Sequence, residues 1–272
     1  MKKKLFLIII PVFFILAPIF FVYFKQEEML FKSSHLDANH KFSYESPFEE
    51  ITLKTSNGGL INALHFKVNN PKGVILFCHG RGKNMERSCD YRSKIFTSKE
   101  YDFFIFDYRG FGKSKGKRNE INIYNDALEC YQYLESQYSE ENIIIYGRSL
   151  GTGIATYVAS KTSPNTLILE SPYYSVLELA PAQIPYIPRF LIPFVLKYHL
   201  RSDLNIQKVR APIIIFHGTE DVLIPFNSST RLLEKALLSN SKKLVPLPNL
   251  GHSGLSKSPI YITEIDSILL KD

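Results

Sequence analysis

The sequence is poor in cysteine, with only Cys78, Cys89 and Cys130 among its 272 residues. Three cysteines at uneven spacing provide neither a disulfide framework nor the paired ligands of a zinc site. Cys78 ends an apolar run and is expected to be a core residue. No other motif in the chain requires a metal or an organic cofactor, so we expect none.

The chain also lacks internal repeats, low-complexity stretches and a recognisable nucleic-acid-binding motif. Its formal net charge is +7, but the basic residues are scattered and are not interleaved with aromatic ones, so no nucleic-acid partner is expected. A hydrophobic content of 45% and a charged content of 22% are typical of a folded protein. The length suits one large α/β domain or two small ones.

One long apolar run is present, from Leu5 to Phe24, and it is about as long as a membrane-spanning helix. Three lysines precede it, which predicts a cytoplasmic N-terminus and a following domain on the non-cytoplasmic side. A cleaved signal peptide is the alternative, but residues 19–24 lack the small side chains of a cleavage site. We therefore predict a membrane anchor over residues 1–25 that contacts lipid, a linker without clear periodicity over residues 26–48, and a catalytic domain over residues 49–272.

The rest of the chain alternates between strand and helix patterns. A turn signature, Ser56-Asn57-Gly58-Gly59, separates the first two strands and predicts a hairpin. From Val74 onward the strands are continuous apolar runs, which are typical of a parallel sheet with helices on both faces. The predicted strands are Ile51–Thr55, Leu60–Phe66, Val74–Cys78, Phe103–Phe106, Ile143–Tyr146, Thr166–Leu169, Ile213–Phe216 and Leu244–Leu247, and the predicted helices lie near residues 86–99, 121–137, 150–161, 227–239 and 257–270.

The motif Gly-x-Ser-x-Gly occurs twice, around Ser149 and around Ser114. Ser149 lies between an apolar strand and a helix of small residues, the setting of a nucleophile elbow, whose flanking glycines let strand and helix pass closely. Ser114 is followed by a charged stretch, so we interpret its segment as a solvated loop. That segment also lacks the first glycine of a phosphate-binding loop, because the position holds Asp107.

Two further polar residues follow predicted strands near the C-terminus. Asp221 comes after Ile213–Phe216, and His252 comes after Leu244–Leu247. Ligands of parallel sheets bind at the carboxyl ends of strands, so Ser149, Asp221 and His252 are expected to lie together. The order Ser, Asp, His is that of an α/β-hydrolase triad, in which serine is the nucleophile, histidine the base, and aspartate holds the imidazole. The adjacent Glu220 is the rival for the acidic role.

The chain resembles the α/β-hydrolase superfamily, in particular the membrane-anchored serine hydrolases of the Bem46 and alpha/beta-hydrolase-domain type. The matching motifs span about residues 49–270, and they are His79-Gly80, the stretch from Asp107 to Gly116, Gly147–Gly151, Glu170-Ser171-Pro172, His217–Asp221 and Gly251-His252. The resemblance implies an α/β-hydrolase fold with a mostly parallel eight-stranded sheet. One departure is Arg81 after the His-Gly pair, where that group often has Asn.

The fold that this resemblance implies also suggests the remaining roles. The backbone N–H groups of Leu150 and Arg81 are expected to form the oxyanion hole. His79 is expected to support the loop, Arg148 to form a salt bridge, and residues 107–109 to be structural. Residues 172–204 are predicted to form a small cap, and Pro181, Pro185, Pro188 and Pro193 within it exclude one long helix.

The predicted function is that of a serine hydrolase that cleaves a carboxylic ester or thioester through an acyl-enzyme. A small-molecule, lipid-like or acylated substrate is expected from the anchor and the apolar cap. Three alternatives stay open: a serine peptidase, an acyltransferase, and a catalytically silent binding protein on the same fold.

Overall fold

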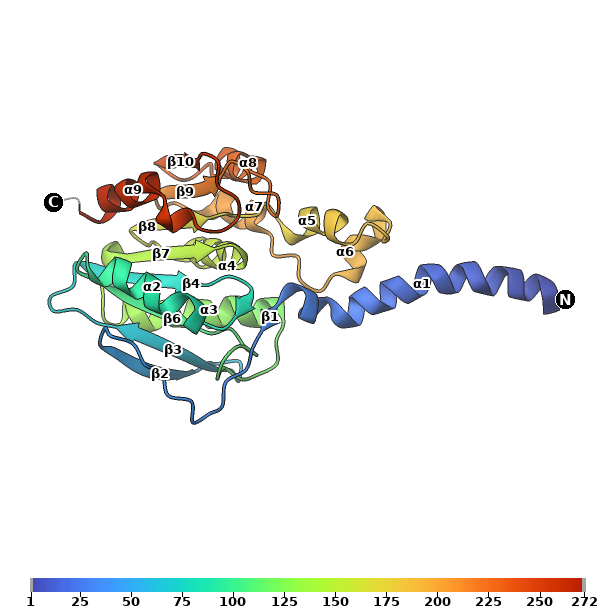
Figure 1. Ribbon diagram of the computed structural model, residues 1–272, viewed down its shortest axis with the longest axis horizontal. Coiled ribbons are helices and arrows are strands. Elements are labelled where there is room, and N and C mark those ends of the chain that lie inside the picture. Colours follow the sequence, from blue (N-terminus) through green and yellow to red (C-terminus); the bar gives the residue numbers. More distant parts are fainter. Residues whose placement is uncertain (1, 271–272) are drawn as a thin grey trace.

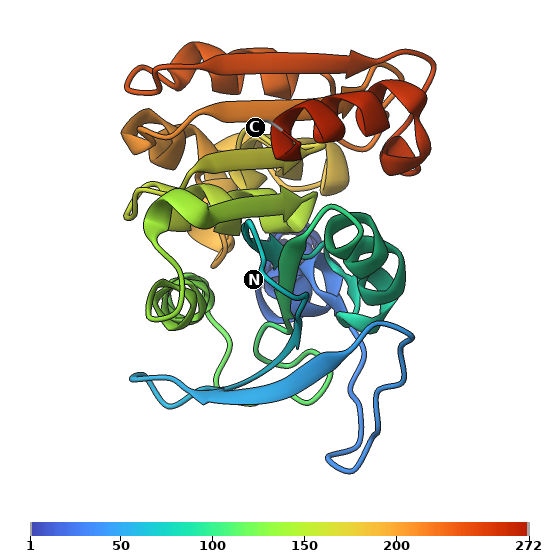
Figure 2. The same cartoon turned by 90° about the vertical axis from the view of Figure 1, so that its left-hand side faces the viewer.

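The computed structural model describes the backbone of residues 2–270 and the side chains from residue 16 onward. An eight-stranded sheet runs through the molecule in the order β10-β9-β8-β7-β4-β6-β3-β2 (Figures 1 and 2). Its strands are β2 (Phe48–Lys54), β3 (Leu60–Phe66), β4 (Gly73–Cys78), β6 (Tyr101–Phe106), β7 (Ile143–Arg148), β8 (Thr166–Glu170), β9 (Ile213–Gly218) and β10 (Lys242–Leu247). Two short segments, β1 (Lys32–Ser33) and β5 (Gly82–Lys83), pair with each other outside this sheet.

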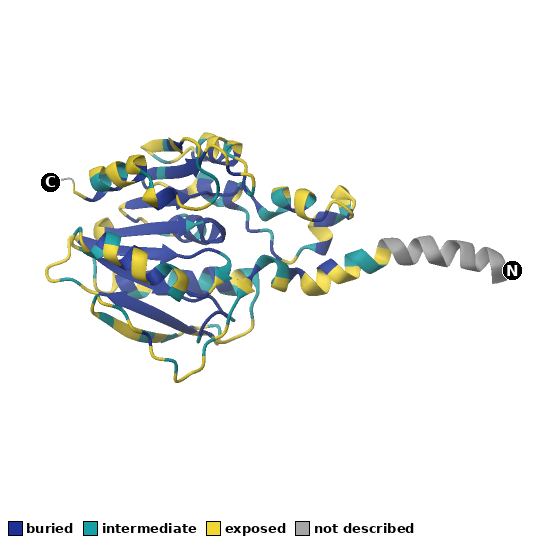
Figure 3. Cartoon of the chain, in the orientation of Figure 1, coloured by how far each residue is buried: buried dark blue, intermediate teal, exposed yellow. Residues whose placement is uncertain are grey.

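The sheet is mostly parallel, as the sequence predicts. From β6 through β10 every pair of neighbouring strands is parallel, and only the hairpin β2–β3 and the pair β3–β6 are antiparallel. The inner parallel strands are buried on both faces, whereas the edge strands β2 and β10 have several exposed side chains (Figure 3). This agrees with the continuous apolar runs of the inner strands.

Helices cover both faces of the sheet. One buried cluster joins the strands to α3, α4 and α8, and a second joins them to α2 and α9 on the opposite face (Figure 2). The helices are α1 (Lys2–Leu30), α2 (Glu86–Thr97), α3 (Glu120–Glu135), α4 (Leu150–Ala159), α5 (Val176–Gln183), α6 (Ile192–Val195), α7 (Ser202–Asn205), α8 (Asn227–Lys235) and α9 (Pro259–Leu269).

The segment predicted as a cap folds into the short helices α5, α6 and α7, in keeping with its prolines. The cap packs beside α1, which projects from the domain (Figure 1). A third apolar cluster joins Val22 of α1 to Ala180, Ile184, Ile187, Ile192 and Val195 of the cap. The cap therefore has two neighbours, the domain built around the sheet and the N-terminal helix.

Helix α1 continues to Leu30, beyond the start of the linker predicted over residues 26–48. The difference has a physical cause, because contacts with the distant cap stabilise this end of the helix and the local sequence does not show them. Of the predicted anchor, residues 1–25, residue 1 and the side chains of residues 2–15 lie outside the described part. Among the residues that the structure describes, no helix is long and apolar enough to span a membrane.

A buried carboxylate, Glu170 at the end of β8, links the end of β7 to α2. Its Oε2 atom accepts hydrogen bonds from Arg92 of α2 at 2.6 Å and from the hydroxyl of Tyr146 at 2.6 Å. Its Oε1 atom lies 3.0 Å from Nε of Arg148, so the salt bridge expected of Arg148 is present. Burial alone would raise the pKa of Glu170, but the two arginines and the Tyr146 hydroxyl hold this pKa below its ordinary value of 4.5.

Replacing Arg92 with Met is expected to destabilise the fold by about 3 kcal/mol at neutral pH, because it leaves Glu170 buried without its main counter-charge. The control is Lys94→Met on the same helix, whose exposed ion pairs contribute little. Chemical denaturation of both variants beside the wild type measures the difference.

The pH dependence of this loss follows from the sign of the shift. A depressed carboxyl pKa stabilises the fold above the unfolded value of 4.5, and this contribution is lost as the pH falls through the folded value. The deficit of Arg92→Met should therefore narrow below about pH 4.5. A deficit equal to that of Lys94→Met, or one that does not change with pH, would contradict this account.

Candidate active site

A strained turn connects β7 to α4, and Ser149 occupies it. The backbone of Ser149 has φ 51° and ψ −119°, a region that residues other than glycine rarely adopt. Its N–H group donates a hydrogen bond of 2.9 Å to the carbonyl oxygen of Glu170 on the neighbouring strand. This geometry is that of the predicted nucleophile elbow.

The glycines on either side of Ser149 have no room for a side chain. A Cβ atom on Gly151 would lie 2.0 Å from the carbonyl oxygen of Cys78, and one on Gly147 would lie 2.6 Å from Cβ of Ala155. Helix α4 thus passes against the ends of β4 and β7, as the small residues of the motif predict. The close contact fixes the direction in which the serine leaves the sheet.

The structure brings Ser149, His252 and Asp221 together, although 103 residues separate the first two. Oγ of Ser149 lies 2.8 Å from Nε2 of His252, and Nδ1 of His252 lies 2.7 Å from Oδ2 of Asp221. An ionised carboxylate only accepts hydrogen bonds, so Nδ1 carries the proton of a neutral His252. Nε2 is then left to accept a hydrogen bond from the serine hydroxyl.

Asp221 is held in its ionised form by several donors. Its Oδ1 atom accepts hydrogen bonds of 2.9 Å from the backbone N–H groups of Leu223 and Ile224. Burial alone would raise the pKa of Asp221, but hydrogen bonds from His217, His252 and the N–H of Ile224 hold the pKa well below its usual range. The rival Glu220 is exposed on the same loop, and Asp221 is the residue that contacts His252.

A second histidine, His217, also contacts Asp221. Its role was not predicted from the sequence. Its Nε2 atom lies 3.3 Å from Oδ2 of Asp221 and 3.0 Å from the carbonyl oxygen of Ile224. Its Nδ1 atom lies 2.5 Å from Oγ of Ser229. Since a carbonyl only accepts, Nε2 donates and Nδ1 accepts from Ser229. The signal was its position four residues before Asp221 in the His-Gly-Thr-Glu-Asp motif.

The two residues predicted to supply the oxyanion donors line the same pocket as Ser149. Leu150 is the first residue of α4, and Arg81 lies on the loop after β4. Within residues 2–270, neither backbone N–H group donates a hydrogen bond to a protein acceptor. The Arg81 loop is close to the serine, because a Cβ atom on Gly80 would lie 3.6 Å from Cβ of Ser149.

Buried polar contacts support this loop. Nδ1 of His79 lies 2.7 Å from the carbonyl oxygen of Gly80, and its Nε2 lies 3.2 Å from Oδ1 of Asp107. The hydroxyl of Tyr108 donates a hydrogen bond of 2.7 Å to the carbonyl oxygen of His79. His79 and Asp107 therefore have the supporting positions that the sequence suggests.

The segment around Ser114 corrects the sequence interpretation in part. Ser114 is buried, and its hydroxyl donates to the carbonyl oxygen of Asp107 at 2.7 Å and accepts from the N–H of Asn62 at 2.9 Å. A solvated loop was expected because the charged residues that follow dominate the local composition. The serine is instead a structural residue that joins the loop to β3.

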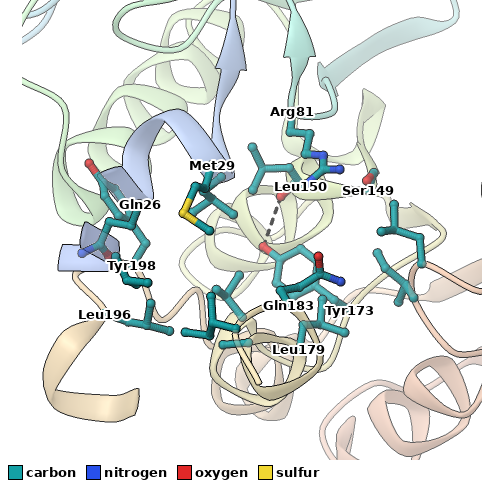
Figure 4. Close-up of a pocket in the computed structure, with 17 residues that line it drawn as sticks. Gln26, Met29, Arg81, Ser149, Leu150, Tyr173, Leu179, Gln183, Leu196 and Tyr198 are labelled. Atoms are coloured by element: carbon teal, nitrogen blue, oxygen red, sulfur yellow. Dashed lines mark hydrogen bonds between the residues drawn. The ribbon is translucent and has the colours of Figure 1, made fainter. Parts of the chain in front are cut away.

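An apolar pocket of about 180 Å³ opens beside Ser149. Its walls come from the Arg81 loop, α4, the cap and the C-terminal part of α1 (Figure 4). Tyr173 closes one side, and its hydroxyl donates a hydrogen bond of 3.1 Å to the carbonyl oxygen of Leu150. Among the side chains that the structure describes, no group of three or more His, Cys, Asp or Glu residues is placed to hold a metal ion.

The sheet order, the elbow and the hydrogen-bonded serine, histidine and aspartate define the class of the protein as an α/β hydrolase by fold. An esterase from Pyrococcus furiosus has a similar structure, with a TM-score of 0.70 at 15% identity, and the match covers 89% of this chain and 97% of that one. The chain belongs to the α/β-hydrolase family described as serine aminopeptidase, S33, whose model matches residues 69–204. The resemblance seen in the sequence is thereby confirmed.

Curated relatives are found in the same superfamily. The lysophosphatidylserine lipase ABHD12 of Danio rerio is 32% identical over 212 residues, which cover 68% of this chain and 55% of the lipase. The alpha/beta hydrolase domain-containing protein 17B of Homo sapiens is 29% identical over 208 residues, which cover 74% of this chain and 70% of that protein. The match thus spans about half the length of the ABHD12 relatives.

Proposed function

We propose that the protein is a serine hydrolase that cleaves a carboxylic ester or thioester with an apolar acyl group. The observation that carries the proposal is the hydrogen-bonded series Ser149–His252–Asp221 at the side of an apolar pocket. A serine hydroxyl is a weak nucleophile until a base removes its proton, and Nε2 of His252 lies at the right distance to do so.

The geometry suggests the following mechanism. Oγ of Ser149 attacks the carbonyl carbon while Nε2 of His252 takes its proton, and Asp221 stabilises the imidazolium that forms. The N–H groups of Leu150 and Arg81 receive the oxyanion, and removing one such donor typically costs about 10²–10³ in rate. His252 then protonates the leaving alcohol or thiol. Water, activated by the same histidine, hydrolyses the acyl-enzyme and frees the serine.

The pocket favours an acyl chain over the amino terminus of a peptide. Among its described lining residues none is an aspartate or glutamate, and Arg81 is the charged one. A free ammonium group would lack a counter-charge there, whereas an acyl chain gains about 0.8 kcal/mol for each buried methylene. The lipid substrate in the name of ABHD12 is of the same chemical kind. An acyltransferase would share the acyl-enzyme and differ only in using an alcohol in place of water.

Labelling of the purified full chain with a fluorophosphonate tests for an activated serine. We expect rapid labelling of the wild type and of Ser114→Ala, and none of Ser149→Ala, because the phosphonate reacts with the serine that His252 deprotonates. Intact-protein mass spectrometry measures the adduct. A folded wild type that does not react would favour the catalytically silent alternative, and a Ser149→Ala variant that still reacts would show that Ser149 is not the activated residue.

We also propose that residues 5–24 anchor the enzyme in a membrane, with the N-terminus cytoplasmic and the domain on the other side. The apolar run and its preceding lysines support this. Large aromatic side chains are also exposed on the cap and on the adjacent α1. They include Phe190 (74% exposed), Phe194 (82%) and Phe24 (67%). Such surfaces are typical of contact with lipid.

The anchor predicts that the full chain stays with the membrane fraction after an alkaline carbonate wash, because a spanning helix is not released by breaking ionic contacts. Release into the supernatant would contradict it. Protease is added to cells whose outer layers have been removed but whose cytoplasmic membrane is intact, and it should digest the domain. Protection of the domain would show that the proposed orientation is wrong.

A further inference from the structure

The end of α1 forms part of the pocket beside Ser149. Val22, Gln26, Met29 and Leu30 all line it, and their spacing places them on one face of the helix. This helix precedes the region that the family model matches, residues 69–204. The wall that it provides therefore lies outside the matched part of the hydrolase domain.

One buried amide fixes the position of α1 against the cap. Nε2 of Gln26 donates a hydrogen bond of 3.1 Å to the carbonyl oxygen of Val195, and its Oε1 accepts one of 2.6 Å from the N–H of Lys197. Gln26 is only 5% exposed, so these bonds satisfy a side chain that would otherwise be costly to bury. Because two hydrogen bonds join one planar amide to one backbone segment, they fix both the rotation of α1 about its axis and its position along that axis.

The neighbouring contacts reinforce this position. Oε1 of Glu27 accepts a hydrogen bond of 2.9 Å from the hydroxyl of Tyr198. Val22 is 1% exposed and packs into the apolar cluster of the cap. The face of α1 that meets the pocket is thus held by apolar packing and by polar contacts at consecutive turns.

The pocket extends from the serine towards this wall. In Figure 4, Ser149 lies at one end of the group of lining residues, Gln26, Leu196 and Tyr198 lie at the other, and Met29 lies between them. An acyl group bound at Ser149 has its carbonyl at the first end. From there the pocket passes Met29 and reaches Gln26, so it offers this path to the alkyl chain.

We propose that residues 22–30 of α1 form the distal wall of the acyl pocket and that Met29 determines which acyl chain lengths are accepted. This inference rests on the proposed ester hydrolysis and assigns the acyl-binding end of that site. Met29 is a flexible thioether that packs well against alkyl chains. A larger, rigid side chain there shortens the pocket, and a smaller one lengthens it.

The test is a series of p-nitrophenyl esters from acetate to laurate with the purified full chain. For the wild type we expect kcat/KM to rise by about fourfold for each methylene that the pocket accommodates. Met29→Trp should lower the ratio of kcat/KM for laurate to that for acetate by about fifteenfold, the loss expected when two methylenes are blocked. Met29→Ala should move the preferred length towards longer chains.

The matched control is Glu28→Trp, which introduces the same side chain on the same helix. The side chain of Glu28 is 71% exposed and does not line the pocket. Its variant should keep the wild-type ratio of laurate to acetate. Thermal unfolding of all variants identifies any that fail to fold. If Met29→Trp is one of them, the chain-length profile of Met29→Ala tests the same position.

The outcomes separate this inference from the proposed function. Equal profiles for Met29→Trp, Glu28→Trp and the wild type, with all three labelled by fluorophosphonate, would overturn the role of α1 and leave the hydrolase standing. A folded wild type that is neither labelled nor active on any ester would overturn the proposed function itself. A shift in the chain-length profile confined to the Met29 variants supports the inference.

Discussion

The close contact of α4 with the ends of β4 and β7 is the constraint on which the rest of the site depends. A Cβ atom at Gly151 would meet the carbonyl oxygen of Cys78 at 2.0 Å, so the helix can start only where it does. The chain must therefore turn sharply at Ser149, which adopts φ 51° to do so. The surrounding sheet offsets this backbone strain, because the N–H of Ser149 donates a hydrogen bond to the carbonyl oxygen of Glu170 on the neighbouring strand.

Two buried carboxylates hold the surroundings of the serine in place, and both stay ionised because donors surround them. Glu170 joins Arg148 at the elbow to Arg92 on α2, so one charge ties the turn to the helical layer on one face of the sheet. Asp221 accepts hydrogen bonds from two backbone N–H groups and is in contact with two histidine side chains. The first carboxylate is a structural support, and the second directs His252 towards Ser149.

Much of the fold could be predicted from the sequence because the inner parallel strands are buried on both faces. Continuous apolar runs such as Ile143–Tyr146 therefore identify strands, and the observed bounds differ by only a few residues. Ser149, Asp221 and His252 were predicted as one site because each follows such a strand. The structure shows that the three side chains are in contact, while their roles in catalysis are a proposal.

Other features could not be predicted, because they depend on contacts between distant segments. Gln26 lies in a polar stretch that resembles a linker, and only the backbone of Val195 and Lys197 explains why it is buried in a helix. Arg92 lies on a polar helix and gives no local sign that it pairs with Glu170. Ser114 precedes charged residues, so its burial against Asp107 and Asn62 was missed.

The central claim is that Ser149, deprotonated by His252, carries the acyl group during the reaction. Acid quenching during turnover of a p-nitrophenyl ester, followed by peptide mass spectrometry, tests it directly, because the good leaving group makes acylation fast. The account predicts an acyl adduct on Ser149, together with a burst of p-nitrophenol equal to the concentration of enzyme. Turnover without an adduct, or an adduct on any other residue, would contradict the account.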